Sequence, residues 1–225
     1  MKFICLIPAR ANSKRLKNKN FLKFKQKRLI EWTMIFSEKI KLFDKILLST
    51  NHPKILKLRK KYPKITFIKR PKKISQDDIP MSKVIKHATN YLKEKLQPYD
   101  AVVILQPTSP LRKINTINKA ISKFKKYAPD YLATVTCAKH NQTPDMTIIK
   151  KNRIFYQQKN ININKNRFKK YYYLDGGVVF IFNKANKNFE LKGKGLFMEV
   201  NFPENIDINT CSDFNLAKKY FNGIY

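Results

Sequence analysis

The sequence predicts an α/β fold in which a mostly parallel sheet is covered by helices on both faces. Short apolar runs alternate with longer segments of helical periodicity over the first two-thirds of the 225 residues, and this alternation is typical of parallel sheets. The run Ala101–Leu105 is continuously apolar, as expected of a strand buried on both faces. Apolar residues make up 43% of the chain, which is enough for the core of one domain spanning residues 1–225.

The predicted elements follow one another in a regular order. Strands are expected at the apolar runs Phe3–Ile7, Lys45–Ser49, Thr66–Ile68, Ala101–Leu105, Tyr131–Cys137, Gly177–Phe182 and Leu196–Val200. Helices are expected where apolar residues recur at helical spacing, namely Leu29–Lys41, Pro53–Tyr62, Met81–Leu96, Ile114–Tyr127 and Ser212–Phe221. Pro53 suits a first helical position and Ser212 suits an N-cap.

Residues 139–172 interrupt this order. They are polar, rich in Lys, Asn and Gln, and show no clear periodicity. We expect a small excursion from the sheet there, built either as a pair of strands or as a dimerisation arm.

The charge balance is strongly basic. The chain has 48 Lys and Arg against 15 Asp and Glu, a formal net charge of +33. Such a charge raises nucleic-acid binding as an alternative function. The lysines, however, occur along the whole chain and in no basic tail. We therefore interpret them as solvated faces and do not expect nucleic acid to be the partner, although the charge would attract phosphates and acidic sugars to any cleft.

The cysteines and the apolar runs indicate a cytoplasmic protein. Cys5, Cys137 and Cys211 lie far apart and none belongs to a CxxC pair, a pattern typical of reduced thiols. No apolar run approaches the ~18 residues of a transmembrane helix, so no membrane partner is expected. The first apolar stretch ends at Arg10, which is too early for a secretory signal and favours a buried first strand.

Glycine and histidine usage excludes several enzyme classes. The chain has 5 glycines, and all fall in its last quarter. Neither a Walker loop nor a GxGxxG dinucleotide loop is present, so ATPase and NAD-binding functions lose their main support. His52, His87 and His140 have no metal-site or triad spacing, and we expect structural or solvated roles for them.

The first chemical motif, residues 7–20, follows the first predicted strand, and ligands of open α/β sheets bind beyond the carboxyl ends of strands. Arg10, Ser13, Lys14 and Lys19 offer cations and a hydroxyl there, which suits a triphosphate; a solvated basic loop is the alternative. Because this loop lacks glycine, Asn12 is the residue expected to adopt a positive φ.

The second motif, LQPTSPLR, runs from Leu105 to Arg112 after the central apolar strand. Its two prolines stiffen the turn, and Gln106, Thr108 and Ser109 present amide and hydroxyl groups at the same edge. A glutamine there can read a base or a sugar through paired donors and acceptors. An ordinary strand-to-helix turn is the alternative.

The third motif is the segment from Asn205 to Thr210. In an extended chain Asp207 and Asn209 project on the same face. Two neighbouring oxygen ligands suit Mg²⁺, which prefers one or two carboxylates together with phosphate oxygens. A capping turn before Ser212 is the alternative.

Together, the IPARxxSKxxxxKN stretch, the LQPTSPLR stretch and the IDIN segment resemble the acylneuraminate cytidylyltransferase family, the CMP-sialic acid synthetases. The order and spacing of the motifs fit along nearly the whole chain, and the related CMP-Kdo synthetases are more distant. The resemblance implies a Rossmann-like nucleotidyltransferase fold, a homodimer, and transfer of CMP from CTP to a sialic-acid-like 2-keto nine-carbon sugar.

The resemblance also implies roles for individual residues. Nucleotide contacts are implied for Arg10, Ala11, Asn12, Ser13, Lys14, Lys19, Asn20, Arg70 and Ser82. Sugar contacts are implied for Gln106, Thr108, Ser109, Arg167 and Asp175, with Arg167 on a dimerisation arm formed by residues 139–172. Asp207 and Asn209 match the pair that holds Mg²⁺, and Arg10, Lys14, Lys19 and Asp207 are the expected catalytic residues.

The sequence departs from the family pattern at three places. Ala11-Asn12 stands where glycine is usual, Asn209 replaces the second metal aspartate, and Asp175-Gly176-Gly177 replaces an Asn-Gly pair. These departures leave open another ulosonic acid of the Kdo type, another nucleotide, or a catalytically impaired member. The expected reaction is in-line attack of the anomeric hydroxyl on the α-phosphorus of CTP, driven by positioning and electrostatics.

Overall fold

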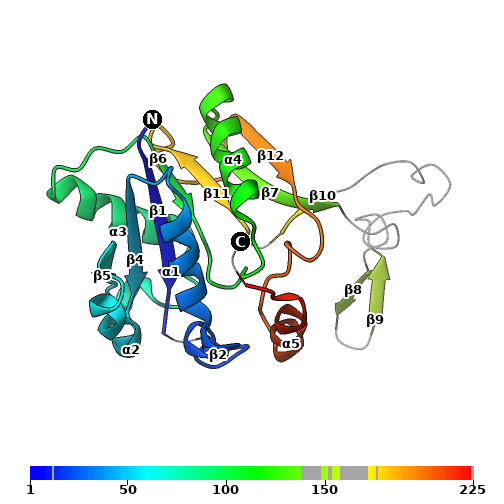
Figure 1. Ribbon diagram of the computed structural model, residues 1–225. Helices are drawn as coiled ribbons and strands as arrows, with labels where there is room; N and C mark the ends of the chain where they lie inside the picture. Colours follow the sequence, from blue (N-terminus) through cyan, green and yellow to red (C-terminus); the bar gives the residue numbers. More distant parts are fainter. Residues whose placement is uncertain (12, 138–147, 152–153, 158–171, 176, 224–225) are drawn as a thin grey trace.

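The computed structural model describes residues 1–11, 13–137, 148–151, 154–157, 172–175 and 177–223, and is built on an eight-stranded sheet (Figure 1). Its strands are β1 (Phe3–Ala9), β4 (Lys45–Thr50), β5 (Ile65–Lys69), β6 (Ala101–Ile104), β7 (Tyr131–Cys137), β10 (Tyr172–Leu174), β11 (Phe180–Asn183) and β12 (Gly195–Glu199). Their order is β10-β7-β11-β6-β1-β4-β5, and β12 also pairs with β7.

The sheet is mostly parallel, as the sequence predicts. β1 runs parallel to β4 and β6, β4 to β5, and β12 to β7. The exception is β11, which lies between β6 and β7 and is antiparallel to both; β10 is also antiparallel to β7. The apolar pattern of the 177–182 run could not show this direction, because a strand buried on both faces reads the same way in either orientation.

Helices cover both faces of the sheet, because alternate residues of each strand point to opposite sides. On one face, Cys5 and Ile7 of β1 pack with α1 (Leu29–Lys39) and α4 (Ile114–Tyr127). On the other face, Ile4 and Leu6 pack with Ile85 of α3 (Met81–Glu94). The predicted α/β architecture with helices on both faces is therefore confirmed.

A third apolar cluster anchors the C-terminal segment that carries the IDIN motif. Here α5 (Cys211–Tyr220) packs on the hairpin of β2 (Lys23–Phe24) and β3 (Lys27–Arg28) through Phe24 and Phe214. Ile206 and Ile208 are buried in the same cluster, whereas Asp207 is only partly buried. The alternation is that of an extended chain, so the two apolar side chains fix the face on which Asp207 and Asn209 project.

Several element boundaries differ from the predictions. The expected helix Pro53–Tyr62 is a short α2 (Pro53–Leu56) followed by the 3-10 turn η2 (Lys57–Lys60). Ser212 is not the N-cap of α5; Thr210 is, because its hydroxyl accepts from Asp213 N and the Asp213 side chain accepts from Thr210 N.

Within residues 139–172, β8 (Ile148–Lys151) and β9 (Ile154–Gln157) form an antiparallel pair. Arg167 lies outside the described residues, as does Asn12. In the part of the chain that is described, no helix has the length and apolar character needed to cross a membrane.

Candidate active site

A cavity of about 490 Å³ opens at the carboxyl ends of the central parallel strands, where ligands of open α/β sheets bind. It brings together all three sequence motifs. It is lined by Pro8, Arg10, Ser13, Lys14, Arg15, Leu16, Lys19, Asn20, Arg70, Ile74, Gln76, Asp77, Ile79, Met81, Val84, Gln106, Pro107, Thr108, Asp207 and Asn209.

The first loop is held by hydrogen bonds between its backbone and two asparagine side chains, Asn20 and Asn51. Ala11 N donates to Asn51 Oδ1 at 2.8 Å, which ties the loop to the end of β4. The buried side chain of Asn20 donates through Nδ2 to Arg10 O at 3.1 Å. Asn18 adopts φ 53° just before the 3-10 turn η1 (Lys19–Phe21). Asn20 thus joins the two ends of the loop, Arg10 and the turn η1.

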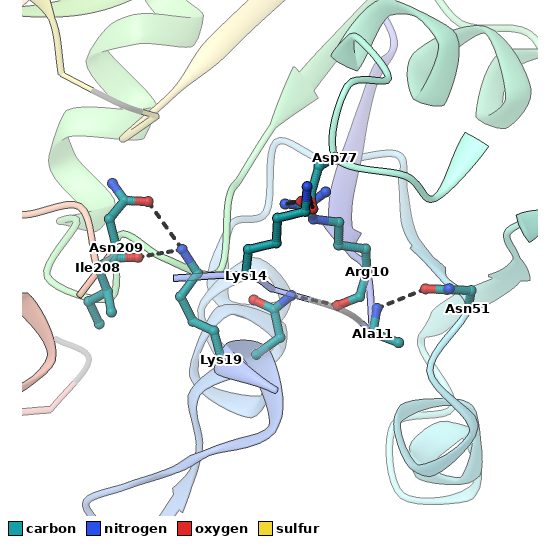
Figure 2. A network of polar contacts seen from close by, with 9 residues as sticks. Arg10, Ala11, Lys14, Lys19, Asn51, Asp77, Ile208 and Asn209 are labelled. Atoms are coloured by element: carbon teal, nitrogen blue, oxygen red, sulfur yellow. Dashed lines mark hydrogen bonds and ion pairs between the residues drawn. The ribbon is translucent and has the colours of Figure 1, made fainter. Parts of the chain in front are cut away.

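Two of the predicted phosphate cations meet one carboxylate. Arg10 Nη2 pairs with Asp77 Oδ1, and Lys14 Nζ lies 3.4 Å from Asp77 Oδ2 (Figure 2). Asp77 was not among the residues expected at the site. One signal in the sequence could have indicated it: Asp77-Asp78 is the only adjacent acidic pair in a chain with just 15 carboxylates.

Lys19 connects the first loop to the C-terminal segment. Its Nζ donates to Ile208 O at 2.5 Å and to Asn209 Oδ1 at 3.3 Å (Figure 2). Burial lowers the pKa of Lys19, and the nearby Asp207 carboxylate opposes this shift. The predicted phosphate cation therefore lies directly beside the predicted metal ligands.

Asp207 is the partly buried carboxylate of the cavity. Its Oδ2 accepts from Asn209 Nδ2 at 2.6 Å. Its Oδ1 is buried and has no partner of normal hydrogen-bond geometry among the described residues. Burial raises the pKa of Asp207, while the Thr108 hydroxyl, Lys19 and Asn209 lower it. The segment is anchored by Ile208 N, which donates to Thr108 O at 2.8 Å.

These residues fit a divalent cation that shares its coordination with phosphate. A buried carboxylate oxygen without a partner and a neighbouring amide oxygen are the ligand types that Mg²⁺ takes. No cluster of three His, Cys, Asp or Glu side chains lies within the described ranges. Asp207 and Asn209 alone would therefore hold such an ion weakly, and phosphate oxygens and water would have to complete its octahedron.

The LQPTSPLR turn places Gln106 and Thr108 on the cavity wall, whereas Ser109 is fully buried and does not line it. Arg112 is also buried, and its Nη2 donates to Gln106 O. Gly177 has φ +131°, and a Cβ at this position would come within 2.5 Å of Gln106 Nε2. Glycine is therefore needed at 177 both for its backbone conformation and to leave room for the Gln106 amide.

Arg70, for which a nucleotide contact is expected, forms part of another wall of the cavity and is almost fully buried. Its Nε donates to Ser49 Oγ at 3.0 Å and its Nη2 to Ser49 O at 2.8 Å. Burial lowers the pKa of Arg70 to about 10. The apolar neighbours Ile74, Ile79 and Met81 complete this wall; nothing in the sequence separates them from ordinary core residues.

Four predicted residues of the described chain do not line the cavity, namely Ala11, Ser82, Ser109 and Asp175. Ser82 is in the first turn of α3 and is absent from the lining. Asp175 is buried, and its Oδ1 accepts from Gly177 N at 3.0 Å and Val178 N at 3.2 Å. Asp175 thus shapes the turn before β11, and its carboxylate is turned to the backbone.

Comparisons with known proteins agree with this geometry. A family model described as cytidylyltransferase matches residues 4–220. The chain is 29% identical to the pseudaminic acid cytidylyltransferase of Campylobacter jejuni strain 81-176, over 97% of this chain and 95% of the relative. It is 29% identical to the CMP-N,N'-diacetyllegionaminic acid synthase of Legionella pneumophila, over 97% and 96%. It is 28% identical to the N-acylneuraminate cytidylyltransferase of Escherichia coli, over 96% of this chain and 51% of that protein.

Solved structures show the same fold. A CMP:2-keto-3-deoxy-manno-octonic acid synthetase complexed with CTP superposes with a TM-score of 0.70 at 12% identity, covering 97% of this chain and 98% of that one. A 4-diphosphocytidyl-2C-methyl-D-erythritol synthase gives 0.69 at 10% identity, covering 97% of both chains. At these identities the likeness concerns the fold alone.

Proposed function

The chain belongs to the cytidylyltransferase family, and from this premise we propose that it transfers CMP from CTP to a nine-carbon 2-keto acidic sugar and releases pyrophosphate. The observation that carries the proposal is the cavity itself. It has a cationic loop on one wall and a partly buried carboxylate, Asp207, on the other, with Lys19 between them. This is the arrangement that a triphosphate and an acceptor hydroxyl require, because charge develops on phosphate oxygens during the transfer.

In the proposed reaction, the anomeric hydroxyl oxygen of the sugar forms a bond to the α-phosphorus of CTP. The bond from that phosphorus to the bridging oxygen of the β-phosphate breaks, pyrophosphate leaves, and the hydroxyl proton passes to water. Arg10, Lys14 and Lys19 would bind the β- and γ-phosphates and stabilise the leaving pyrophosphate. Asp207 and Asn209 would hold Mg²⁺, which would supply neutralisation of phosphate charge.

The chain's own residues would contribute mainly by aligning the substrates and by stabilising charge electrostatically. No histidine of the described chain lines the cavity, and Asp77 is already engaged with two cations. We therefore assign the acceleration to alignment and electrostatic stabilisation, as in phosphoryl transfer generally. Gln106 and Thr108 would contact the sugar, and the buried Arg70 with its apolar neighbours would contact the nucleoside.

The nine-carbon class rests on the curated relatives. Their names include pseudaminic, N-acylneuraminic and legionaminic acids, and all of these matches extend along nearly the whole chain. The octonic acid synthetase supports only the fold, so the Kdo-type acceptor is the weaker alternative. The sequence relatives are about equally similar, and we propose the class of sugar and not one member of it.

The experiment is pyrophosphate release with Mg²⁺, each of the four ribonucleoside triphosphates, and a panel of pseudaminic, N-acetylneuraminic, diacetyllegionaminic and Kdo acids. Chromatography of the products identifies any nucleotide sugar. We expect release only with CTP and a nine-carbon acid. Turnover with Kdo alone, with another nucleotide alone, or with no combination would contradict the proposal.

A homodimer and a cytoplasmic location belong to the same proposal. β10 exposes Tyr172, Tyr173 and Leu174, each between 44% and 50% accessible, at the end of the 139–172 excursion. Such a run of large exposed apolar side chains is typical of an interface. Sedimentation equilibrium of the full chain should give twice the 26.6 kDa of one chain; a monomer at micromolar concentration would contradict this part of the proposal.

A further inference from the structure

The cations of the first loop already have an anion in the free protein. Asp77, between η3 (Lys72–Ile74) and α3, reaches Arg10 Nη2 with one carboxylate oxygen and Lys14 Nζ, at 3.4 Å, with the other (Figure 2). The carboxylate is 30% accessible and Arg10 31%, whereas Lys14 is 84% accessible. The contact is therefore partly open to solvent, and a competing anion from solution can reach it.

This ion pair also lies between two hollows. The first is the 490 Å³ cavity of the proposed active site, and a second, of about 600 Å³, adjoins it. Arg10, Lys14, Gln76 and Asp77 line both. The two cations thus form a shared wall, and Asp77 is the carboxylate that keeps them together.

We propose that Asp77 occupies, in the free protein, the cation pair that phosphates take when they bind, so that it acts as an internal competitor of CTP and pyrophosphate. A carboxylate and a phosphate make the same charge-assisted hydrogen bonds to arginine and lysine. A phosphate on Arg10 and Lys14 would also lie beside the Asp77 carboxylate, and like charges at this distance repel. Binding must therefore displace Asp77, and this cost lowers the affinity.

The competition has a use in a chain of this charge. At +33, an unpaired arginine and lysine in an open cavity would hold many cellular polyanions. The Asp77 carboxylate makes that binding weaker. It also speeds the departure of pyrophosphate, since it forms its ion pairs with Arg10 and Lys14 again. The inference rests on the proposed function only in naming CTP and pyrophosphate as the ligands.

The opposite role makes the opposite prediction. If Asp77 only oriented Arg10 for phosphate, its removal would weaken phosphate binding. If it competes, its removal tightens binding. The sign of the change therefore decides between a positioning residue and a competitor, and both roles can be separated from a general effect of charge by a neighbouring aspartate.

The experiment is calorimetric titration of the full chain with inorganic tripolyphosphate and with CTP, for wild type, Asp77→Asn and Asp78→Asn. Asp78→Asn is the matched control, because it removes the same charge one residue away and Asp78 lines the second hollow but not the first. Asp77→Asn should bind tripolyphosphate on the order of three- to tenfold more tightly. Asp78→Asn should stay within about twofold of wild type, since exposed charges farther from the ligand are screened. Asp77→Asn should also be inhibited by lower pyrophosphate concentrations during turnover.

Thermal unfolding of each variant establishes that it is folded before the titration is interpreted. An unchanged or weaker affinity in Asp77→Asn overturns the inference, and so does an equal gain in both variants. If wild type binds CTP and makes product while Asp77→Asn behaves like wild type, only this inference fails. If wild type neither binds nor uses CTP, the proposed function fails and the inference with it.

Discussion

The cavity has two carboxylates that differ in almost every physical respect. Asp77 is partly exposed, sits on a loop and is paired with two cations. Asp207 is partly buried and is flanked by two isoleucines of an apolar cluster, and its buried Oδ1 has no hydrogen-bond partner of normal geometry among the described residues. Burial raises the pKa of Asp207. The same functional group is thus an exchangeable counter-ion on one wall and a fixed ligand on the other.

The difference between Asp77 and Asp207 shows how solvent exposure can give two carboxylates of one cavity different roles. A carboxylate neutralised by solvent-accessible cations can be replaced by phosphate at modest cost, because water and salt screen what is lost. A carboxylate held out of water with an unsatisfied oxygen is stabilised by any cation that reaches it. Lys19 comes from the first loop but makes its hydrogen bonds on the Asp207 side of the cavity, so it links the two walls.

The largest test of this comparison is Asp207→Asn. It would leave two neutral oxygens at the predicted metal position, and we expect turnover to fall by on the order of a hundredfold or more while the fold is retained. The assay is pyrophosphate release over a range of Mg²⁺ concentrations, with circular dichroism to confirm folding. Asp78→Asn is the control for loss of one charge. Near-normal activity at ordinary Mg²⁺ would mean that the ion is held elsewhere, and the two carboxylates would then not differ in role.

Lys19→Ala tests the bridge between the two walls. Its ammonium contacts Ile208 O and Asn209 Oδ1 and would face transition-state charge, so kcat/KM should fall by about 2–4 kcal/mol. Lys54→Ala, at an exposed position of α2, removes an equal charge and should change kcat/KM little. Comparable small effects from both variants on kcat/KM for CTP would mean that the first loop is a solvated basic turn without a role in phosphate binding.

Asn209→Asp tests whether the pair of residues 207 and 209 binds Mg²⁺. The amide now donates to Asp207 Oδ2 at 2.6 Å, and an aspartate would place two carboxylates in that contact. Mg²⁺ affinity should rise on the order of tenfold with the added ligand charge, and the variant should lose thermal stability without the ion because like charges repel. Melting curves with and without Mg²⁺ measure both. A variant whose melting temperature does not respond to Mg²⁺ more than that of wild type would contradict a metal role for this pair.

The sequence was sufficient for the architecture because its signals are local. Apolar runs and helical spacing predicted the parallel strands and the helices on both faces, and the motif at 7–20 was placed correctly at a strand end. The direction of β11 and the N-cap at Thr210 depend on tertiary pairing and on a capping box, and the sequence analysis did not predict them. The boundary between the short α2 and η2 also depends on tertiary packing and differs from the single helix predicted.

For the site, the sequence located the cations and the Asp207–Asn209 pair but not their partners. Asp77 lies 67 positions from Arg10 along the chain, and only the fold brings the two together. Ser109 and Asp175 carry polar groups that the pattern could not distinguish from ligands, yet one is fully buried and the other binds backbone N–H groups. The positive φ expected at Asn12 and the sugar contact expected at Arg167 concern residues outside the described chain and stay predictions.

The smallest expected effect concerns stability, and here Asp207 should be compared with Asp213. Burial raises the pKa of Asp207, so the folded protein holds this proton to higher pH than the unfolded chain does. Its stability therefore falls as pH rises through that window.

The pKa of Asp213 shifts in the opposite direction. Burial would raise this pKa, but hydrogen bonds from Asn209 N, Thr210 N and the Thr210 hydroxyl lower it. Its contribution is present above the ordinary aspartate pKa and is lost as pH falls through the lowered value. At pH 7, Asp207→Asn should therefore melt above wild type, while Asp213→Asn should lose up to about 1 kcal/mol, because a neutral amide oxygen accepts the same hydrogen bonds less strongly than a carboxylate. Both differences should vanish in acid, and differential scanning calorimetry from pH 3 to 8 measures them. An Asp207→Asn variant that melts below wild type at pH 7 would show that the fold stabilises this carboxylate in its charged form. Asp207 would then resemble Asp77, whose charge is neutralised by neighbouring cations.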